Sequence, residues 1–197
     1  IIYADPPWRF KVWSIDTGLG RAADAHYQTM PFEDIKKMII PSDDNCALFL
    51  WAVSPQLPEA FELIKAWGFE YKTVAFNWSK TFKYGKPYFG LGYWTRAGAE
   101  ICLLATKGKV KRVSKAVPQL IVSPIREHSR KPDEVRTRIV QLIGDLPRIE
   151  LFARQKTDGW DVWGNEVESD IHLLTHTTPK GERMKTIEQA IRDKILY

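Results

Sequence analysis

Apolar positions along the chain follow two alternating patterns, which together predict an α/β domain. Candidate strands lie near residues 1–4, 46–52, 71–78, 100–106, 119–123 and 148–152, and 46–52 is a continuous apolar run. Between the second and third of them, Leu57, Phe61 and Ile64 recur at the spacing of one helical face. Strands that alternate with helices in this way are typical of a mainly parallel central sheet flanked by helices.

Two stretches depart from this alternation. Residues 79–98 are rich in Gly, Tyr and Lys and show no periodicity, and loops of that length inside a compact domain are usually functional or mobile. From Glu168 the chain becomes polar, and 182–196 has the pattern of a terminal helix. We therefore expect one main domain over residues 1–167 and a helical C-terminal extension over 168–197.

Composition narrows the class of protein. The net charge of +5 and the pI near 9.1 permit binding to a polyanion without requiring it. No apolar stretch is long enough to span a membrane. The apolar start gives way at once to Asp5 and Pro6, so we expect no signal peptide and a cytoplasmic protein. Cys46 and Cys102 lie in apolar runs, as buried free thiols do, and no metal-ligand spacing surrounds them, so no metal site is predicted.

The tetrapeptide Asp5-Pro6-Pro7-Trp8 directly follows the first strand stretch. Ligands of open α/β sheets bind beyond the carboxyl ends of the strands. Asp5 offers a carboxylate, and both prolines lack an N–H, so the loop presents acceptors that include the Pro6 carbonyl. Trp8 adds a flat apolar platform. This combination suits a planar group that carries an NH2, such as adenine or cytosine.

The chemistry of such an amine explains why it needs this loop. Its lone pair is delocalised into the ring, so the amine is a poor nucleophile. Hydrogen bonds to Asp5 and to the Pro6 carbonyl favour a more pyramidal nitrogen, whose lone pair can point at an electrophilic methyl group. Fixed acceptors also stabilise the positive charge that develops during transfer, and alignment of the two reactants contributes much of the rest. The alternative interpretation is a helix-capping aspartate followed by a Pro-Pro turn.

These residues resemble the catalytic motif of N6-adenine methyltransferases, and other segments narrow the resemblance to the MT-A70 family. Those segments are residues 26–30, 48–51, 131–134, 149–154, 159–160 and 163–166. The similarity runs from about residue 2 to residue 167. It implies a Rossmann-like methyltransferase fold in permuted motif order. It also implies S-adenosyl-L-methionine as the methyl donor, S-adenosyl-L-homocysteine as the product, and a catalytic role for residues 5–8.

The resemblance also implies roles for individual side chains. On the cofactor side, Lys131 meets the methionyl carboxylate and Asp5 lies close to both the cofactor and the target amine. The ribose and adenine of the cofactor are surrounded by Glu150, Arg154, Asn165 and Glu166. The substrate pocket is expected to include Trp8, Tyr27, Trp94, Arg96 and Glu100.

General physics agrees with two of these roles. Lys131 is predicted to begin a helix, where donors and the helix dipole favour an anion. Glu150 is predicted to end a strand, where a carboxylate can accept hydrogen bonds from ribose hydroxyls. The alternatives are a solvated lysine at a helix start, and a Glu150 that pairs with Arg148 or Arg154.

A basic run between two predicted strands offers contacts to phosphates, and its candidate residues are Lys109, Lys111 and Arg112. The alternative is a solvated hairpin. A compact chain without accessory RNA modules resembles the DNA-modifying branch found in bacterial or phage-infected cells, so DNA is favoured over RNA as the partner. Three alternatives stay open. They are an RNA N6-adenosine methyltransferase, a non-catalytic nucleic-acid-binding subunit, and a methyltransferase of small molecules or protein amides. A homodimer or a partner subunit is compatible with each.

Overall fold

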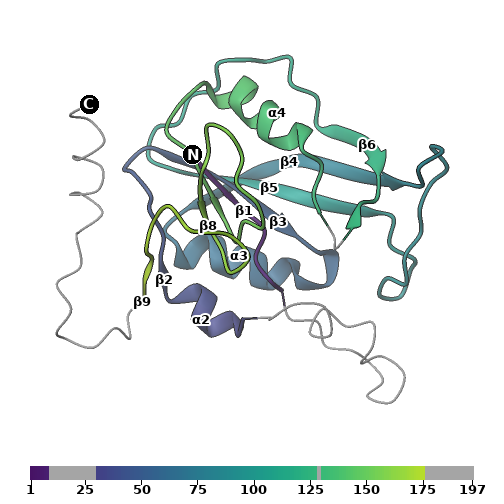
Figure 1. The fold of residues 1–197 in the computed structure, drawn as a ribbon, viewed down its shortest axis with the longest axis horizontal. Helices are drawn as coiled ribbons and strands as arrows, with labels where there is room; N and C mark the ends of the chain where they lie inside the picture. Colours follow the sequence, from purple (N-terminus) through teal and green to yellow (C-terminus); the bar gives the residue numbers. More distant parts are fainter. Residues whose placement is uncertain (9–29, 128–129, 176–197) are drawn as a thin grey trace.

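A computed structural model describes residues 1–8, 30–127 and 130–175 and contains a seven-stranded sheet with helices on both faces (Figure 1). The strands, in spatial order, are β6 (Leu120–Pro124), β4 (Glu70–Thr81), β5 (Ala99–Lys107), β3 (Cys46–Ala52), β1 (Ile2–Ala4), β7 (Ile149–Leu151) and β8 (Asp161–Trp163). Only the pairs that include β5 are antiparallel; the other four pairs are parallel. The predicted fold class, a Rossmann-like α/β fold with a mainly parallel sheet, is confirmed.

The first strand, β1, lies in the middle of the sheet, between β3 and β7. A first strand in this position is common to doubly wound sheets, so the permuted motif order stays a prediction. The loop that follows β1, which carries Asp5, emerges at the centre of the sheet edge.

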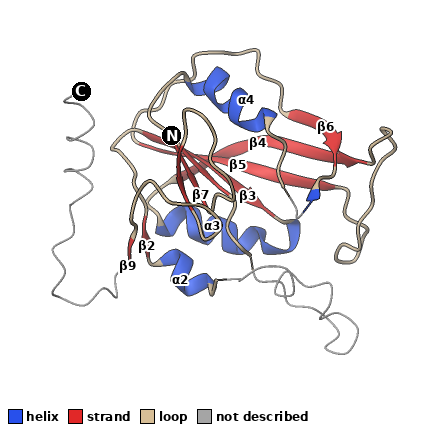
Figure 2. Cartoon of the chain, viewed as in Figure 1, coloured by secondary structure: helices blue, strands red, loops and turns tan. Residues whose placement is uncertain are grey.

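Both faces of the sheet are covered, which explains why β3 is continuously apolar. Leu48 and Leu50 belong to a core shared with α2 (Phe32–Lys36) and α3 (Leu57–Ala66). Phe49 and Trp51 belong to a second core shared with α4 (Glu134–Ile143). In Figure 2, α2 and α3 lie on one side of the sheet and α4 lies on the other. No helix in the described ranges is long and apolar enough to cross a membrane.

Two helices are followed by glycine, and a third is followed by a short strand. A positive φ is found at Gly68 after α3 and at Gly144 after α4, where glycine meets no steric penalty. The helix α2 ends at Lys36, and β2 (Met38–Ile39) follows it. That strand pairs with β9 (Leu174–Thr175), a partner so distant in sequence that local periodicity carries no sign of it.

The first part of the C-terminal extension packs onto the main domain. Asp170 accepts a hydrogen bond from the Val162 backbone and pairs with Lys156. Ile171 and Leu173 pack against the α3-side core. The helix predicted over 182–196 lies outside the described residues, so it stays a prediction.

Candidate active site

Strand direction brings the candidate residues to one edge of the sheet. Ala4 is paired with Leu50 of β3 and Leu151 of β7, so these parallel strands end together. Asp5 therefore begins the loop at this carboxyl edge, and Glu150 lies one residue before the end of β7. Because β5 is antiparallel, Glu100 enters the same edge at the beginning of its strand.

The loop after β1 is held by two hydrogen bonds. The Trp8 amide donates to the Pro6 carbonyl (2.8 Å), which closes a three-residue turn around Pro7. The Trp8 indole N–H donates to the Trp51 carbonyl (3.0 Å). The Pro6 carbonyl thus uses one of its two lone pairs within the loop.

The same bonds set the exposure of the two side chains that flank the prolines. The Trp8 ring is buried and lies against Phe32. Its observed role is to anchor the loop, and its role as a stacking platform stays a prediction. The Asp5 side chain remains one-quarter exposed, so it is within reach of a ligand.

Four side chains of alternating charge, Asp5, Lys131, Glu100 and Lys80, form what we call the ionic chain. The Lys131 ammonium is 2.7 Å from an Asp5 oxygen and 3.3 Å from a Glu100 oxygen. Lys80 donates to the other oxygen of Glu100. The Lys131 and Glu100 side chains are only 10% and 11% exposed, so the opposite charges must satisfy one another. The Lys131 ammonium also lies 5.5 Å from the centre of the Trp51 ring.

Burial and pairing act in opposite directions on the titration of this chain. Burial lowers the pKa of Lys131, but Asp5 and Glu100 outweigh it and raise the pKa above its ordinary value. Burial raises the pKa of Glu100, but Lys131 and Lys80 outweigh it and lower the pKa below its ordinary value. Both groups are therefore charged at neutral pH.

One feature of Lys131 differs from the sequence prediction. The helix α4 begins at Glu134, three residues later, so Lys131 lies in the loop before it. Pro132 accounts for the difference, because a residue before proline is kept out of the helical region. Lys131 therefore contacts the carboxylates of Asp5 and Glu100 through its ammonium group, and it is not part of the first turn of α4.

Glu150 pairs with a residue that sequence analysis did not name. The Arg136 guanidinium donates to both Glu150 oxygens, at 2.7 and 2.8 Å. Burial raises the pKa of Glu150, and Arg136 partly opposes this rise. The alternative pairings with Arg148 and Arg154 are wrong, since Arg148 bonds Asp145 and Arg154 faces Glu166.

A close backbone approach shapes the loops that follow β7 and β8. A Cβ at Gly164 would lie 2.1 Å from the Ala153 carbonyl oxygen, so only glycine fits there. Phe152 adopts a left-handed backbone (φ +62°), which is strained for a non-glycine residue. This geometry leaves Arg154 3.8 Å from Glu166. Asn165, exposed beside Glu166, lies in the same turn. The predicted cofactor residues thus lie near the ends of strands or in the loops after them, at the edge of the sheet that carries Asp5.

The structure separates the predicted substrate residues into three groups. Glu100 belongs to the ionic chain. Trp94 is 95% exposed and lies in the loop between β4 and β5, and its place at the substrate pocket stays a prediction. Arg96 donates to the carbonyls of Phe89 and Gly90 within that loop. Tyr27 lies outside the described residues.

The basic run is far from this group. Lys107, the last residue of β5, is opposite Cys46, the first residue of β3. The exposed side chains that follow, Lys109, Lys111 and Arg112, therefore lie beyond the opposite edge of the sheet from Asp5. The structure thus does not bring them to the group around Asp5, and their contact with phosphates stays a prediction.

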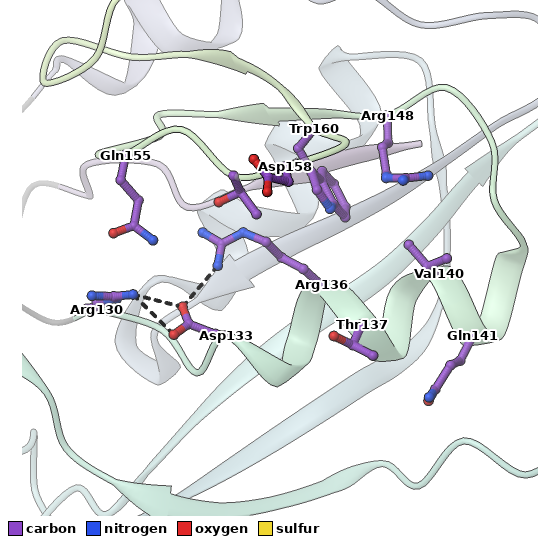
Figure 3. A pocket seen from close by; sticks show the side chains of 11 residues that line it. Arg130, Asp133, Arg136, Thr137, Val140, Gln141, Arg148, Gln155, Asp158 and Trp160 are labelled. Atoms are coloured by element: carbon purple, nitrogen blue, oxygen red, sulfur yellow. Dashed lines mark hydrogen bonds and ion pairs between the residues drawn. The ribbon is translucent and has the colours of Figure 1, made fainter.

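A pocket of about 480 Å³ lies between α4 and the loop after β7 (Figure 3). Arg130, Asp133 and Arg136 line it on the α4 side, and Gln155 and Asp158 face them. Neither Asp5 nor Lys131 lines this pocket. Arg136 connects the pocket to the site, because the same guanidinium contacts Asp133 in the pocket and Glu150 behind it.

Comparison with known proteins identifies the family. The sequence model of the MT-A70 family matches residues 1–166. This chain belongs to the MT-A70 family. It is therefore a methyltransferase of a family whose members in general use S-adenosylmethionine.

Two curated MT-A70 relatives differ in how much of their length is matched. A type II methyltransferase, M.MunI, from a Mycoplasma species is 36% identical over 185 residues, which cover 85% of this chain and 77% of that protein. The human N(6)-adenosine-methyltransferase catalytic subunit METTL3 is 28% identical over 184 residues, 88% of this chain and 29% of that protein. The zebrafish METTL3 subunit gives the same identity and coverage. The chain thus spans about three-quarters of the bacterial relative and less than a third of the METTL3 subunits.

Proposed function

We propose that this MT-A70 methyltransferase transfers the methyl group of S-adenosylmethionine to the N6 amine of adenine in DNA. The observation that carries the proposal is the position of Asp5. Its carboxylate lies on a proline-stiffened loop at the centre of the carboxyl edge, partly exposed, and bonded to the buried Lys131. A scaffold without chemistry does not need a carboxylate and a lysine held together there, which argues against a non-catalytic subunit.

The side chains at this edge fit the functional groups of the cofactor. S-adenosylmethionine carries an ammonium, a carboxylate and two ribose hydroxyls. Asp5 can accept from the ammonium, Lys131 can donate to the carboxylate, and Glu150 can accept from a hydroxyl. Arg154, Asn165 and Glu166 would hold the adenosine part. When bound, the cofactor supplies a methyl group on a positively charged sulfur.

The residues of the loop would prepare the nucleophile. Asp5 and the Pro6 carbonyl accept the two N–H groups of the adenine amine, and the nitrogen lone pair is then directed at the methyl carbon. The bound cofactor would supply the methyl group, and Asp5 and the Pro6 carbonyl would hold the amine until one N6 proton leaves to solvent. Glu100 keeps the Lys131 charge balanced while Asp5 turns to the amine, so the ammonium is never left unpaired in a buried position.

The relatives support DNA as the favoured polymer. M.MunI is named as a type II methyltransferase and not as an adenosine methyltransferase, and this chain matches most of its length. RNA is the second candidate, because the METTL3 subunits are named as adenosine methyltransferases. Either polymer would be met in the cytoplasm of a bacterial or phage-infected cell.

Identification of the methylated nucleoside tests the proposal. The protein is incubated with methyl-labelled S-adenosylmethionine and matched adenine-containing DNA duplexes, DNA single strands or RNA. The polymers are then digested and the nucleosides analysed by mass spectrometry. Asp5→Ala is compared with Asp34→Ala, a matched control on the exposed side of α2.

We expect N6-methyl-deoxyadenosine from DNA with the wild type and with Asp34→Ala, and none with Asp5→Ala. The same mark confined to RNA would keep the chemistry and overturn the choice of polymer. No transfer to any polymer, despite measurable cofactor binding, would contradict the proposal.

A further inference from the structure

The loop between β4 and β5, residues 82–98, turns large apolar side chains toward solvent. Tyr84 is 90% exposed and Trp94 is 95% exposed. The loop exposes four more large apolar side chains, Phe82, Phe89, Leu91 and Tyr93. Isolated exposed apolar residues are ordinary, but a group of this size on one segment marks a binding surface. In Figure 1 the loop extends beyond the ends of β4 and β5.

Backbone hydrogen bonds hold this loop in one shape. The Tyr88 amide donates to the Lys80 carbonyl, and the Gly90 amide donates to the Ala97 carbonyl. Gly92 has a positive φ, and a Cβ there would lie 1.9 Å from the Thr95 carbonyl oxygen. The exposed rings are therefore presented by an ordered backbone, which lowers the entropy cost of binding.

Trp94 itself is held against its backbone preference. Its φ of +66° lies in the left-handed region, which L residues other than glycine seldom adopt. The backbone at Trp94 is therefore strained, and its indole ring makes almost no contact with the rest of the described chain. A ring that is strained and unburied contributes little to folding, so its contribution lies in binding.

Charge favours a polyanion as the occupant of this surface. No acidic residue occurs from Tyr71 to Ala99, whereas Lys83 and Lys86 lie in the loop itself. Neither lysine has an acidic partner within the described ranges. A surface with exposed rings and unpaired lysines suits a single-stranded nucleic acid. The rings can stack on unstacked bases, and the ammonium groups can contact phosphates.

We propose that the 82–98 loop binds nucleic acid beside the target adenine, with Trp94 and Tyr84 stacked on unstacked bases and Lys83 and Lys86 on phosphates. The proposal rests on the proposed function for the identity of the polymer. Position supports it, since the strands that bear the loop also bear Lys80 and Glu100 of the ionic chain. The loop therefore begins at the edge where the adenine amine would meet Asp5.

Binding of a labelled single-stranded DNA of mixed sequence, measured by fluorescence anisotropy, tests the proposal without any methyl transfer. Trp94→Ala should weaken binding by about 5- to 150-fold, the range found for loss of one base-stacking ring. Phe61→Ala, which removes an exposed ring on α3, is the matched control and should leave the affinity unchanged.

Salt dependence separates the lysines from the rings. The double variant Lys83→Ala/Lys86→Ala should lower the slope of log affinity against log salt concentration by about 1.4. Lys37→Ala/Lys65→Ala removes the same charge from exposed positions after α2 and on α3 and should leave the slope nearly unchanged. Equal slopes for the two double variants would contradict the proposal.

The variant Trp94→Gly tests whether a loss of DNA binding is caused by misfolding. Glycine relieves the positive φ, so thermal stability should be retained or raised while DNA affinity falls. If Trp94 variants instead convert a dimer to a monomer in sedimentation and bind DNA normally, the surface joins two copies of the chain and the proposal is overturned. DNA binding through the loop without N6 methylation would overturn only the proposed function.

Discussion

The ionic chain and the 82–98 loop lie at the same edge of the sheet and break the usual distribution of side chains in opposite ways. The ionic chain places four charged groups side by side from Asp5 to Lys80, and two of them, Lys131 and Glu100, are almost inaccessible to water. The loop exposes rings such as Tyr84 and Trp94 almost completely. Elsewhere in the described chain, the two cores on the sheet faces consist of apolar side chains, as folding requires.

This difference indicates a division of work between two adjacent regions. Buried charge is costly unless every group is paired, and exposed rings forgo the free energy of burial. The first cost is offset by pairing within the ionic chain, and the second would be offset by a ligand that covers the rings. The regions are also joined physically, because the Lys80 backbone bonds both Tyr88 and Gly98 while its side chain bonds Glu100.

Removal of Lys131 should have the largest effect on the buried region. Lys131→Met leaves Asp5 and Glu100 near each other without the cation between them. We expect a loss of about 4–5 kcal/mol in the free energy of unfolding, measured by urea denaturation, together with loss of methyl transfer. DNA binding by the folded fraction, in contrast, should be nearly unchanged, because the loop does not depend on Lys131.

Lys107→Met is the control for this variant, since Lys107 is partly buried but bonds only the Ser42 hydroxyl in the described chain. We expect a much smaller loss for it. Similar losses for the two lysine variants would show that the ionic chain has no special place in the fold.

A double-mutant cycle on Arg136 and Glu150 should give the next largest effect. Arg136→Met leaves a buried carboxylate without its bidentate partner, at a cost of about 3 kcal/mol. Adding Glu150→Gln should restore much of this stability, because no buried charge is then left unpaired. Cofactor affinity, measured by calorimetry, should stay low in the double variant. Additive losses in the cycle would argue against a coupled pair.

Glu100 should have a smaller effect, which appears in the free energy of unfolding at acidic pH. Folding lowers its pKa below the ordinary value of 4.5, so the ionised group contributes stability above that value and loses it as pH falls through the lower folded value. Glu100→Gln should therefore flatten the decline in unfolding free energy below about pH 4.5. A decline as steep as that of the wild type would assign the acid sensitivity to other carboxylates.

Local patterns in the sequence were enough to predict the fold class and the loop that carries Asp5. Runs such as Cys46–Ala52 are buried on both faces, so their composition alone predicts a central strand. Asp5 could be assigned because a rare tetrapeptide directly follows a strand, and the carboxyl edge of such a sheet is where ligands bind.

Contacts between distant segments were beyond the same patterns. Arg136 lies on a helix and meets Glu150 across a connection that no periodicity describes. Lys80 reaches Glu100 only through the pairing of β4 with β5. The position of the basic residues near Lys109 was also beyond these patterns, because the antiparallel strand β5 carries its following loop to the opposite edge. The direction of each strand depends on the pairing of the whole sheet. It determines which charged loop lies at the edge that carries Asp5.

The rate of methyl transfer by Asp5→Asn in a single turnover, with cofactor and adenine-containing duplex both saturating, tests the central claim most directly. Asparagine keeps the shape of the side chain but loses the negative charge that should accept the amine. We expect the rate to fall roughly 100- to 1,000-fold, with DNA affinity held within about twofold of wild type. A rate close to that of the wild type would contradict the assignment of the chemistry to Asp5.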